Sequence, residues 1–454
     1  MTEERHQTRA DRAGTERSWL TRPLTRREFL VGSGAVVLGA AAACSGGGPD
    51  TTASASRTAN VPTPDPTTVG TATPIKRVVV VMKENRSFDH LFGLFPGANG
   101  ATTGVLDGEQ VSLTPGVDRL PQDLPHHYAD AIKDWNQGAM DGFGRSEHTR
   151  TYAFTQQRPD QIPNYWHWAQ ANVLGDNFFA SAMGPSFPNH LYMIAGQSGR
   201  VHDQPVHDDP PSGKARSWGC DTVETSRVVV THEDGSKEEV FPCFDFPTCG
   251  DLLLDMGIDW RYYSADETQS GYIWNAYTTI EHVRHSDLWN QHFRPVDALI
   301  EDIGANRLPP VTWVTPKFDL ADHPKFQSSL CEGEGWATEV VNAIMQSPMW
   351  EETAIFITWD EWGGFYDHVS PPQIDEFGLG IRVPLLAISP FAKQGFVDPT
   401  LGEFCSFLRF IEDNWGLEQL TGRDRQASNL FSAFDFDQSP RGPDAVPPRA
   451  CAQG

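Results

Sequence analysis

The sequence predicts an α/β fold with a mostly parallel central sheet and helices on both of its faces. Short apolar runs, each separated from the next by a long mixed stretch, are the predicted strands: residues 78–82, 260–264, 311–315, 354–359 and 384–388. Residues 335–346, between the third and fourth runs, carry Ala, Val and Ile at the spacing of an amphipathic helix. Strands that alternate with helices indicate a parallel sheet covered on both sides.

The composition limits the classes of protein to which the chain can belong. The 454 residues include 35 Lys and Arg against 60 Asp and Glu, a formal net charge of −25. This charge argues against nucleic-acid binding, because neutralising phosphates requires a basic face. Hydrophobic residues at 39% and aromatic residues at 11% are enough for a large core, so a wholly disordered chain is excluded.

One catalytic domain is expected over residues 75–437. No internal repeat and no second Pro- and Ser-rich linker divides this segment. Residues 438–454, rich in Pro and Ala, are predicted to be a peripheral tail, which Cys451 can fasten to the domain.

Residues 1–44 have the features of a twin-arginine export signal. Arg26 and Arg27 stand just before an apolar run, residues 29–43, which is too short to span a bilayer and ends in small residues. Either Cys44 is lipidated, giving a cell-surface lipoprotein, or the Ala-x-Ala pattern before it is cleaved, giving a secreted or periplasmic protein. The Ser-, Thr- and Pro-rich residues 45–74 are typical of a flexible tether, which favours the lipoprotein.

Export also predicts disulfide bonds, because oxidising compartments preserve them. Six cysteines remain after Cys44, an even number. We expect a local bond between Cys220 and either Cys243 or Cys249, and the sequence leaves the choice open. No close pair of cysteines has the spacing of a zinc knuckle.

Polar side chains follow two of the predicted strands without a spacer. Glu84 and Asn85 come after the strand at 78–82, and Asp360 and Glu361 come directly after the strand at 354–359. Ligands of parallel α/β sheets bind at the carboxyl ends of the strands, where these side chains would meet. Carboxylate and amide oxygens suit a hard divalent cation. We therefore prefer a metal site to the alternative of solvated loop acids.

Ser186 and several histidines are further candidates for chemistry. Ser186 stands in a tight turn before an apolar segment that we predict to be a helix, where free N–H groups would stabilise an alkoxide or a phosphate. Serine before a helix is most often only its N-cap, so this signal is weak alone. Four histidines in polar contexts can protonate a leaving group or hold phosphate oxygens, although a structural role is the default for each one: His126, His282, His323 and His368.

Four ordered motifs together resemble a known family. Residues 84–90 with Gly93 resemble the ENRSFDxxxG signature of the phosphoesterase family that contains bacterial and plant non-specific phospholipases C and a related acid phosphatase. Residues 186–190 resemble its (T/S)xPNR element, residues 360–372 its DExxGxxDHVxPP element, and residues 380–384 its GxRVP element. The resemblance covers residues 75–436 and implies an alkaline-phosphatase-like fold, in agreement with the parallel sheet.

The resemblance also implies roles for individual residues. Ser186 would be the nucleophile. One divalent metal ion (Ca, Mg, Mn or Zn) would be bound by Ser186 together with Glu84, Asn85, Asp360 and Glu361. His126, His323 and His282 would be the site histidines, with His285 as the alternative to His282. Asp367, His368 and Asn189 are further candidate site residues. Asp367 and His368 would support the residues that contact the metal or substrate. The chain departs from the family pattern at His190, where many relatives have Arg.

The expected activity is metal-assisted phosphoryl transfer through a phosphoserine. The leading hypothesis is phospholipase C-type hydrolysis of a phospholipid to diacylglycerol and a phosphorylated headgroup, at a membrane surface reached through the substrate or a lipid anchor. The first alternative is a broad-specificity acid phosphatase that uses the same site. A second alternative, from another class, is a surface lipoprotein that only binds a partner.

Overall fold

The computed structural model describes residues 69–206, 217–325 and 327–451. An eight-stranded sheet lies at the centre, in the order β10-β9-β11-β1-β12-β13-β6-β14. The strands of this sheet are β1 (Arg77–Lys83), β6 (Val173–Gly175), β9 (Trp260–Ser264), β10 (Phe293–Pro295), β11 (Val311–Val314), β12 (Thr353–Trp359), β13 (Leu385–Ile388) and β14 (Phe396–Asp398). All five predicted strands are present, and the predicted α/β class is confirmed.

One strand, β13, runs antiparallel to both of its neighbours, β12 and β6, whereas the other pairs of the sheet are parallel. The connection from β12 to β13, residues 360–384, contains no helix. A parallel strand needs a crossover that returns the chain to the opposite end of the sheet, usually through a helix. The irregular connection instead stays at the edge where β12 ends, so β13 starts from that edge.

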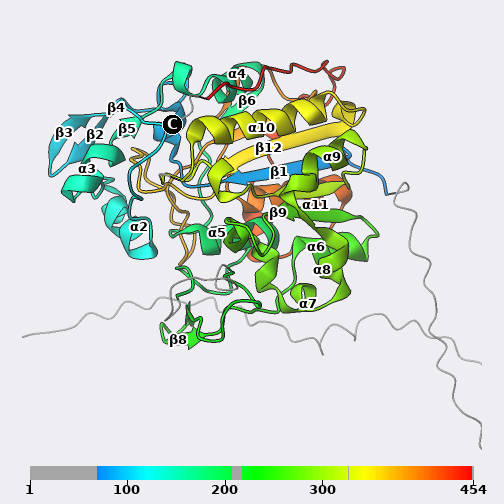
Figure 1. The fold of residues 1–454 in the computed structure, drawn as a ribbon, viewed down its shortest axis with the longest axis horizontal. Coiled ribbons are helices and arrows are strands. Elements are labelled where there is room, and N and C mark those ends of the chain that lie inside the picture. The colour runs from blue at the N-terminus through cyan, green and yellow to red at the C-terminus, as the bar shows by residue number, and fades with distance from the viewer. Residues whose placement is uncertain (1–68, 207–216, 326, 452–454) are drawn as a thin grey trace, which may run out of the picture. The chain divides into compact units, whose positions relative to one another are not determined.

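Helices cover both faces of the sheet (Figure 1). Alternate residues of β1 face the two layers. Val78 and Val80 belong to the core that includes residues of α5, α6 and α11, while Val79 and Val81 belong to the core that includes residues of α4, α9 and α10. All four valines are at most 1% exposed. The described helices are α1 (Phe88–Phe92), α2 (Tyr128–Trp135), α3 (Glu147–Ala153), α4 (Pro163–Ala171), α5 (Ser186–Ala195), α6 (Cys249–Asp255), α7 (Glu281–Arg284), α8 (Asp287–His292), α9 (Leu299–Gly304), α10 (Leu330–Met345), α11 (Cys405–Trp415) and α12 (Gly422–Gln426).

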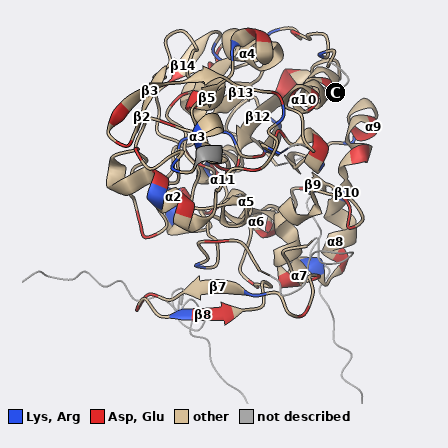
Figure 2. Cartoon of the chain, turned by 60° about the vertical axis from the view of Figure 1, so that its left-hand side comes forward, with Lys and Arg blue, Asp and Glu red and all other residues tan. Residues whose placement is uncertain are grey.

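The predicted helix at 335–346 is α10, which begins five residues earlier because Ser329 caps it by accepting a hydrogen bond from Glu332 N. Three small two-stranded sheets lie outside the central sheet: β2 (Thr103–Leu106) with β3 (Glu109–Ser112), β4 (Thr114–Pro115) with β5 (Thr155–Gln156), and β7 (Val228–Thr231) with β8 (Lys237–Val240). Figure 2 shows acidic segments on α2, α9 and β8, in keeping with the negative net charge.

Two disulfide bonds fasten loops and the C-terminal tail. Cys220 pairs with Cys243, one of the two predicted partners, and Cys331 pairs with Cys451. Cys249 and Cys405 are buried free thiols. The tail also lies against α10, where Asn342 exchanges hydrogen bonds with the backbone of residue 446.

The predicted export signal, residues 1–44, and residues 45–68 of the predicted tether lie outside the described residues. Among the helices that the structure describes, none combines the length and the apolar character needed to cross a membrane.

Candidate functional site

The register between β1 and β12 brings the two predicted acidic motifs together. These parallel strands pair residue for residue, with Lys83 opposite Trp359, so that Glu84 and Asp360 follow at the same edge of the sheet. Asp360 N donates to the carbonyl oxygen of Lys83 (3.0 Å), and Asn85 N donates to Asp360 Oδ1 (2.8 Å). Glu84, Asn85 and Asp360 are fully buried. Two local motifs, 275 residues apart, thus form one cluster.

A tight backbone contact places Asn85 and Glu361. Asn85 adopts a left-handed conformation (φ 61°), and its Nδ2 donates to Glu361 Oε1. Gly363 N donates to Glu361 Oε2 (2.6 Å). Gly363 itself has φ 64°, and a Cβ there would clash with the carbonyl oxygen of Asn85. Only glycine fits this position, because a side chain would be both strained and blocked.

Ser186 joins this cluster from helix α5, of which it is the first residue. Its Oγ donates to Glu84 Oε2 (3.2 Å). The turn before it is held by Asn189, whose Oδ1 accepts from Ala182 N (2.9 Å) and whose Nδ2 donates to the carbonyl oxygen of Pro185 (3.0 Å). Asn189 therefore positions the turn that delivers the serine.

His190, which sequence analysis left without a role, also lies in the cluster. Its Nε2 is 2.8 Å from Glu84 Oε1 and 3.9 Å from Asp360 Oδ2. Ser186 and His190 lie on one face of α5, because residues four apart in a helix project in the same direction. The spacing of Ser186 and His190 was the signal in the sequence that could have revealed this placement.

The electrostatics of the cluster favour a bound cation. Burial raises the pKa of Glu84, Asp360 and Glu361, and mutual repulsion among the carboxylates adds to the rise for Glu84 and Glu361. Within the described ranges, no Lys or Arg forms an ion pair with these three carboxyls. Buried carboxylates without a countercharge are costly, and a divalent cation supplies the missing positive charge.

Unpartnered oxygen atoms in the cluster fit the same cation. Asn85 Oδ1 and Asp360 Oδ2 are buried and have no hydrogen-bond partner among the described residues. Oxygen atoms of this kind are ligands that Ca²⁺, Mg²⁺ and Mn²⁺ accept. The residues that the sequence predicts as metal ligands therefore fit a divalent metal ion.

Two of the predicted histidines border the cluster. His126 Nδ1 donates to the carbonyl oxygen of Leu124 (2.6 Å), and its Nε2 lies 4.0 Å from Glu361 Oε1. The rings of His126 and His323 are 5.7 Å apart. Asp123, which sequence analysis missed, lies within 3.8 Å of both rings. Burial lowers the pKa of His323 well below its usual value.

The loop that carries His323 is fixed through its neighbour Asp322. Asp322 Oδ2 accepts hydrogen bonds from Tyr165 (2.8 Å) and from Trp359 Nε1 (3.1 Å). Arg86 Nε donates to the carbonyl oxygen of Asp322 (2.8 Å). The backbone of Asp322 has φ 71°, a strained conformation that these bonds hold in place.

His282 and His285, the candidates for the remaining histidine, are not brought to the cluster by any contact that the structure describes. His282 Nδ1 lies 2.6 Å from Asp245 Oδ1, and its Nε2 lies 3.0 Å from Asp251 Oδ1. His285 is exposed at the end of α7. The role of either histidine stays a prediction.

Asp367 and His368 form a second buried cluster with Asp89 and Arg382. Arg382 lies 3.1 Å from Asp367 Oδ1 and 3.2 Å from Asp89 Oδ1, and His368 Nδ1 lies 2.6 Å from Asp89 Oδ2. Because these acids have an arginine as countercharge, the cluster is a structural ion-pair network. It joins residues 367–369 of the third motif to α1. Unlike the carboxylates around Glu84, these carboxylates have a positively charged partner.

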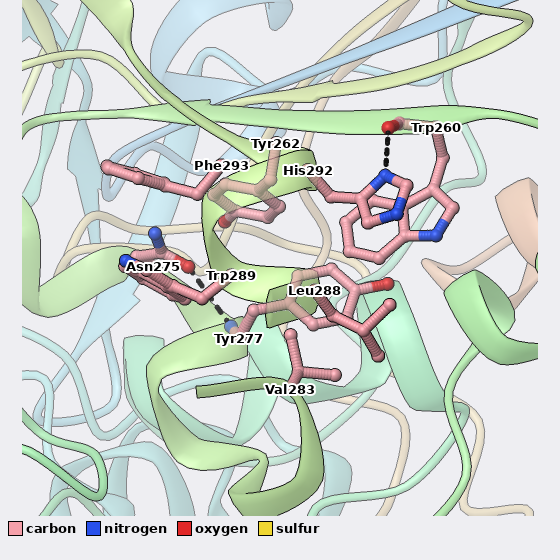
Figure 3. Close-up of a pocket in the computed structure, with 9 residues that line it drawn as sticks. All are labelled: Trp260, Tyr262, Asn275, Tyr277, Val283, Leu288, Trp289, His292 and Phe293. Atoms are coloured by element: carbon pink, nitrogen blue, oxygen red, sulfur yellow. Dashed lines mark hydrogen bonds between the residues drawn. The ribbon is translucent and has the colours of Figure 1, made fainter. Parts of the chain in front are cut away.

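Figure 3 shows an aromatic crevice that is lined by none of the residues of the acidic cluster. The ring of Trp260 stacks on the rings of Tyr277 and His292. The distances between ring centroids are 4.5 Å and 4.4 Å. The side chains that line it include no carboxylate: Trp260, Tyr262, Asn275, Tyr277, Val283, Leu288, Trp289, His292 and Phe293. It is the packing of α7 and α8 against β9, and it lacks the carboxylates of a hard-cation site.

Comparison with known proteins decides the family. The model of the phosphoesterase family matches residues 75–418. The chain belongs to the phosphoesterase family. Hemolytic phospholipase C from Pseudomonas aeruginosa is 29% identical over 437 residues, covering 81% of this chain and 57% of that protein. Phospholipase C B from Mycobacterium tuberculosis is 26% identical over 443 residues, covering 82% of this chain and 80% of that protein.

This phosphoesterase chain thus spans less than two thirds of the length of the Pseudomonas relative. Among solved structures, a protein in the alkaline phosphatase superfamily from Vibrio parahaemolyticus is similar at 10% identity with a TM-score of 0.36, covering 77% of this chain and 69% of that one. The prediction of the family from its four motifs is confirmed.

Proposed function

We propose that this phosphoesterase is a metal-dependent hydrolase of phosphate esters that cleaves phospholipids in the manner of a phospholipase C. The observation that carries the proposal is the hydroxyl of Ser186, 3.2 Å from Glu84 Oε2, inside a buried group of carboxylates that lacks a countercharge. The choice of a phospholipid as the substrate is supported by the relatives, which are named phospholipases C.

In the proposed mechanism Ser186 Oγ attacks phosphorus and Glu84 Oε2 receives the hydroxyl proton. The residues that would hold the metal ion are Glu84, Asn85, Ser186, Asp360 and Glu361. When bound, a divalent cation would offset most of the negative charge of these carboxylates and lower the pKa of the hydroxyl. The P–O bond to diacylglycerol breaks as the Oγ–P bond forms, and an in-line arrangement of the two oxygens is required.

His126, beside the cluster, is proposed to transfer the proton that the leaving alcohol requires. His126 Nδ1 is occupied by the carbonyl oxygen of Leu124, so Nε2 is the nitrogen that faces the reacting group. In its protonated form, His126 Nε2 delivers a proton to the departing alkoxide. The same nitrogen then accepts a proton from the water that attacks phosphoserine. As the P–Oγ bond breaks, Glu84 returns its proton to Ser186 Oγ, which releases the phosphorylated headgroup and restores the serine.

A two-substrate assay tests this function. Phosphatidylcholine vesicles and p-nitrophenyl phosphate are offered to the wild-type protein, to Ser186→Ala and to Ser112→Ala, a change at an exposed serine of β3. We expect phosphocholine release by the wild type and Ser112→Ala, and a loss of about 10⁴-fold or more in Ser186→Ala. Hydrolysis of the monoester alone would instead make the protein a phosphatase. Unchanged turnover in Ser186→Ala would exclude the proposed nucleophile, and no turnover by the wild type would favour a binding protein.

We further propose that the protein is exported by the twin-arginine route. The support is the Arg26–Arg27 motif with its apolar run, together with the two disulfide bonds, which oxidising compartments preserve. Fractionation of a bacterial host should find the wild type outside the cytoplasm and the Arg26→Lys/Arg27→Lys variant inside it. Partition of the wild type, but not of Cys44→Ala, into a detergent phase would identify the lipoprotein; equal partition of both would identify the secreted form.

A further inference from the structure

We propose that His190 supplies a nitrogen ligand to the metal ion of this site, so that the site prefers a transition-metal ion such as Zn²⁺ or Fe²⁺ to Ca²⁺ or Mg²⁺. The inference rests on the proposed metal-dependent function and adds to it the class of metal. It concerns a residue at which this chain departs from the motif that it otherwise follows.

The distances around His190 Nε2 are those between ligands of one ion. Nε2 lies 2.8 Å from Glu84 Oε1 and 3.9 Å from Asp360 Oδ2, and one donor atom from each of the three residues lies within 4.8 Å of the other two. With metal–ligand bonds of about 2.0–2.3 Å, neighbouring ligands lie about 3 Å apart and opposite ligands about 4–4.6 Å apart. A single ion can therefore contact all three.

Burial and missing partners point to the same ion. His190 is 2% exposed, and Glu84 and Asp360 are not exposed at all. Asp360 Oδ2, which faces His190, has no hydrogen-bond partner among the described residues, and neither does Asn85 Oδ1. Buried polar atoms of native proteins are nearly always satisfied, so each such oxygen requires an explanation. A cation between Glu84, Asp360 and His190 supplies one.

The imidazole is free to act as a ligand. His190 Nδ1 has no partner among the described residues, while Nε2 lies 2.8 Å from Glu84 Oε1. Without a metal ion Nε2 therefore carries the ring proton and donates to that carboxylate, and a bound cation would move the proton to the unoccupied Nδ1. With the proton on Nδ1, Nε2 offers its lone pair to the metal. A neutral imidazole also leaves the charge deficit of the carboxylates unchanged, so it does not replace the cation.

Arginine, which the resembling motif has at this position, differs in chemistry. A guanidinium brings a positive charge and only donors, and it has no lone pair for a metal. Its replacement by imidazole therefore exchanges a competitor of the cation for a ligand. Imidazole nitrogen suits Zn²⁺ and Fe²⁺, whereas Ca²⁺, Mg²⁺ and Mn²⁺ are typical of oxygen-rich sites.

Pulsed electron paramagnetic resonance of bound Mn²⁺ tests the inference without reference to activity. The chelator-treated full chain is loaded with one equivalent of Mn²⁺, and its spectrum is searched for the ¹⁴N coupling of a ligating imidazole. We expect this coupling in the wild type, in His126→Gln and in His232→Gln, a change at an exposed histidine beyond β7. We expect its loss in His190→Gln and His190→Arg, with circular dichroism confirming that each variant is folded.

Calorimetric titration with Zn²⁺ and Ca²⁺ adds a second readout. His190→Gln should weaken Zn²⁺ binding at least tenfold and change Ca²⁺ binding less than about threefold. Bound Mn²⁺ without ¹⁴N coupling in the wild type, or coupling lost in His126→Gln instead, would overturn the inference and leave His190 as a hydrogen-bond donor to Glu84, with the proposed function intact. Failure of the wild type to bind any of these ions would overturn the proposed metal dependence itself.

Discussion

The ammonium group of Lys83 lies 3.1 Å from Oδ1 of Asp322, and both side chains are fully buried. Lys83 Nζ also donates to the carbonyl oxygens of Leu320 (2.6 Å) and Gly333 (2.9 Å). Lys83 is the last residue of β1, next to Glu84, while Asp322 precedes His323. This one ion pair therefore ties the acidic strand end to the loop that carries a site histidine.

Breaking this pair should be costly. Lys83→Met leaves the carboxylate of Asp322 buried without its countercharge, and we expect the free energy of unfolding to fall by about 3–5 kcal/mol. Urea unfolding followed by circular dichroism measures the change. The double variant Lys83→Met/Asp322→Asn should recover part of the loss, since neither charge remains. A loss below about 1 kcal/mol in Lys83→Met would show that the pair does not stabilise the fold.

Gly363 should tolerate no side chain. Gly363→Ala places a Cβ against the carbonyl oxygen of Asn85 in a left-handed conformation, so we expect a loss of about 1–3 kcal/mol in stability and weaker metal binding. Gly422→Ala, at the first position of α12 with open space around it, is the matched control and should be neutral. Equal thermal unfolding midpoints of the two variants would contradict this account.

Stability should depend on pH through Glu412. Burial and the neighbouring Asp424 raise the pKa of Glu412 to about 9, from about 4.3 in an unfolded chain. A carboxyl with a raised pKa stabilises the fold fully below the unfolded pKa, and this contribution is lost as pH rises through the folded pKa. Between pH 5 and pH 9 the wild type should therefore lose stability.

Substitution of Glu412 isolates this contribution. Glu412→Gln has no proton to lose, so its stability should fall by about 2–4 kcal/mol less than that of the wild type between pH 5 and pH 9. Chemical unfolding at both pH values, at a fixed low metal concentration, measures the difference. Glu418→Gln, at an exposed position nearby, should behave as the wild type does. Parallel pH profiles for Glu412→Gln and the wild type would refute the assignment.

The bond between Cys331 and Cys451 should stabilise the protein more than its peripheral place suggests. It closes 120 residues, and loops of this length correspond to about 4–5 kcal/mol in the chain-entropy model. We expect Cys451→Ser to lower the unfolding midpoint and to make the tail after Phe436 sensitive to protease. Cys249→Ser, at a free thiol, leaves both disulfides in place and serves as the comparison. Resistance of the Cys451→Ser tail to protease would show that its hydrogen bonds alone hold it.

Local patterns were enough to predict the strands and the acids that follow them. The predicted strands end at residues 82 and 359, and the parallel pairing of β1 with β12 then determines that Glu84 and Asp360 meet. The direction of β13 could not be predicted in this way, because it depends on the absence of a helix in the preceding connection and not on the strand's own residues.

Contacts between distant segments account for what the sequence did not reveal. The spacing of Ser186 and His190 places both on one face of α5, but the packing that brings this face to Glu84 at the end of β1 depends on distant contacts. His282 likewise has carboxylate partners that are 37 and 31 residues away, Asp245 and Asp251. Asp123 lies in a loop without regular structure, where one acid among many carries no distinguishing signal.

The residue-for-residue pairing of β1 with β12 has a consequence for how this chain can vary. Inserting or deleting one residue in either strand would slide its end by about 3.3 Å and turn its side chains to the opposite face of the sheet. Glu84 and Asp360 would then no longer lie together, even with every side chain of the cluster retained. Homologues that keep the activity should therefore conserve the lengths of these two strands as strictly as the acids themselves.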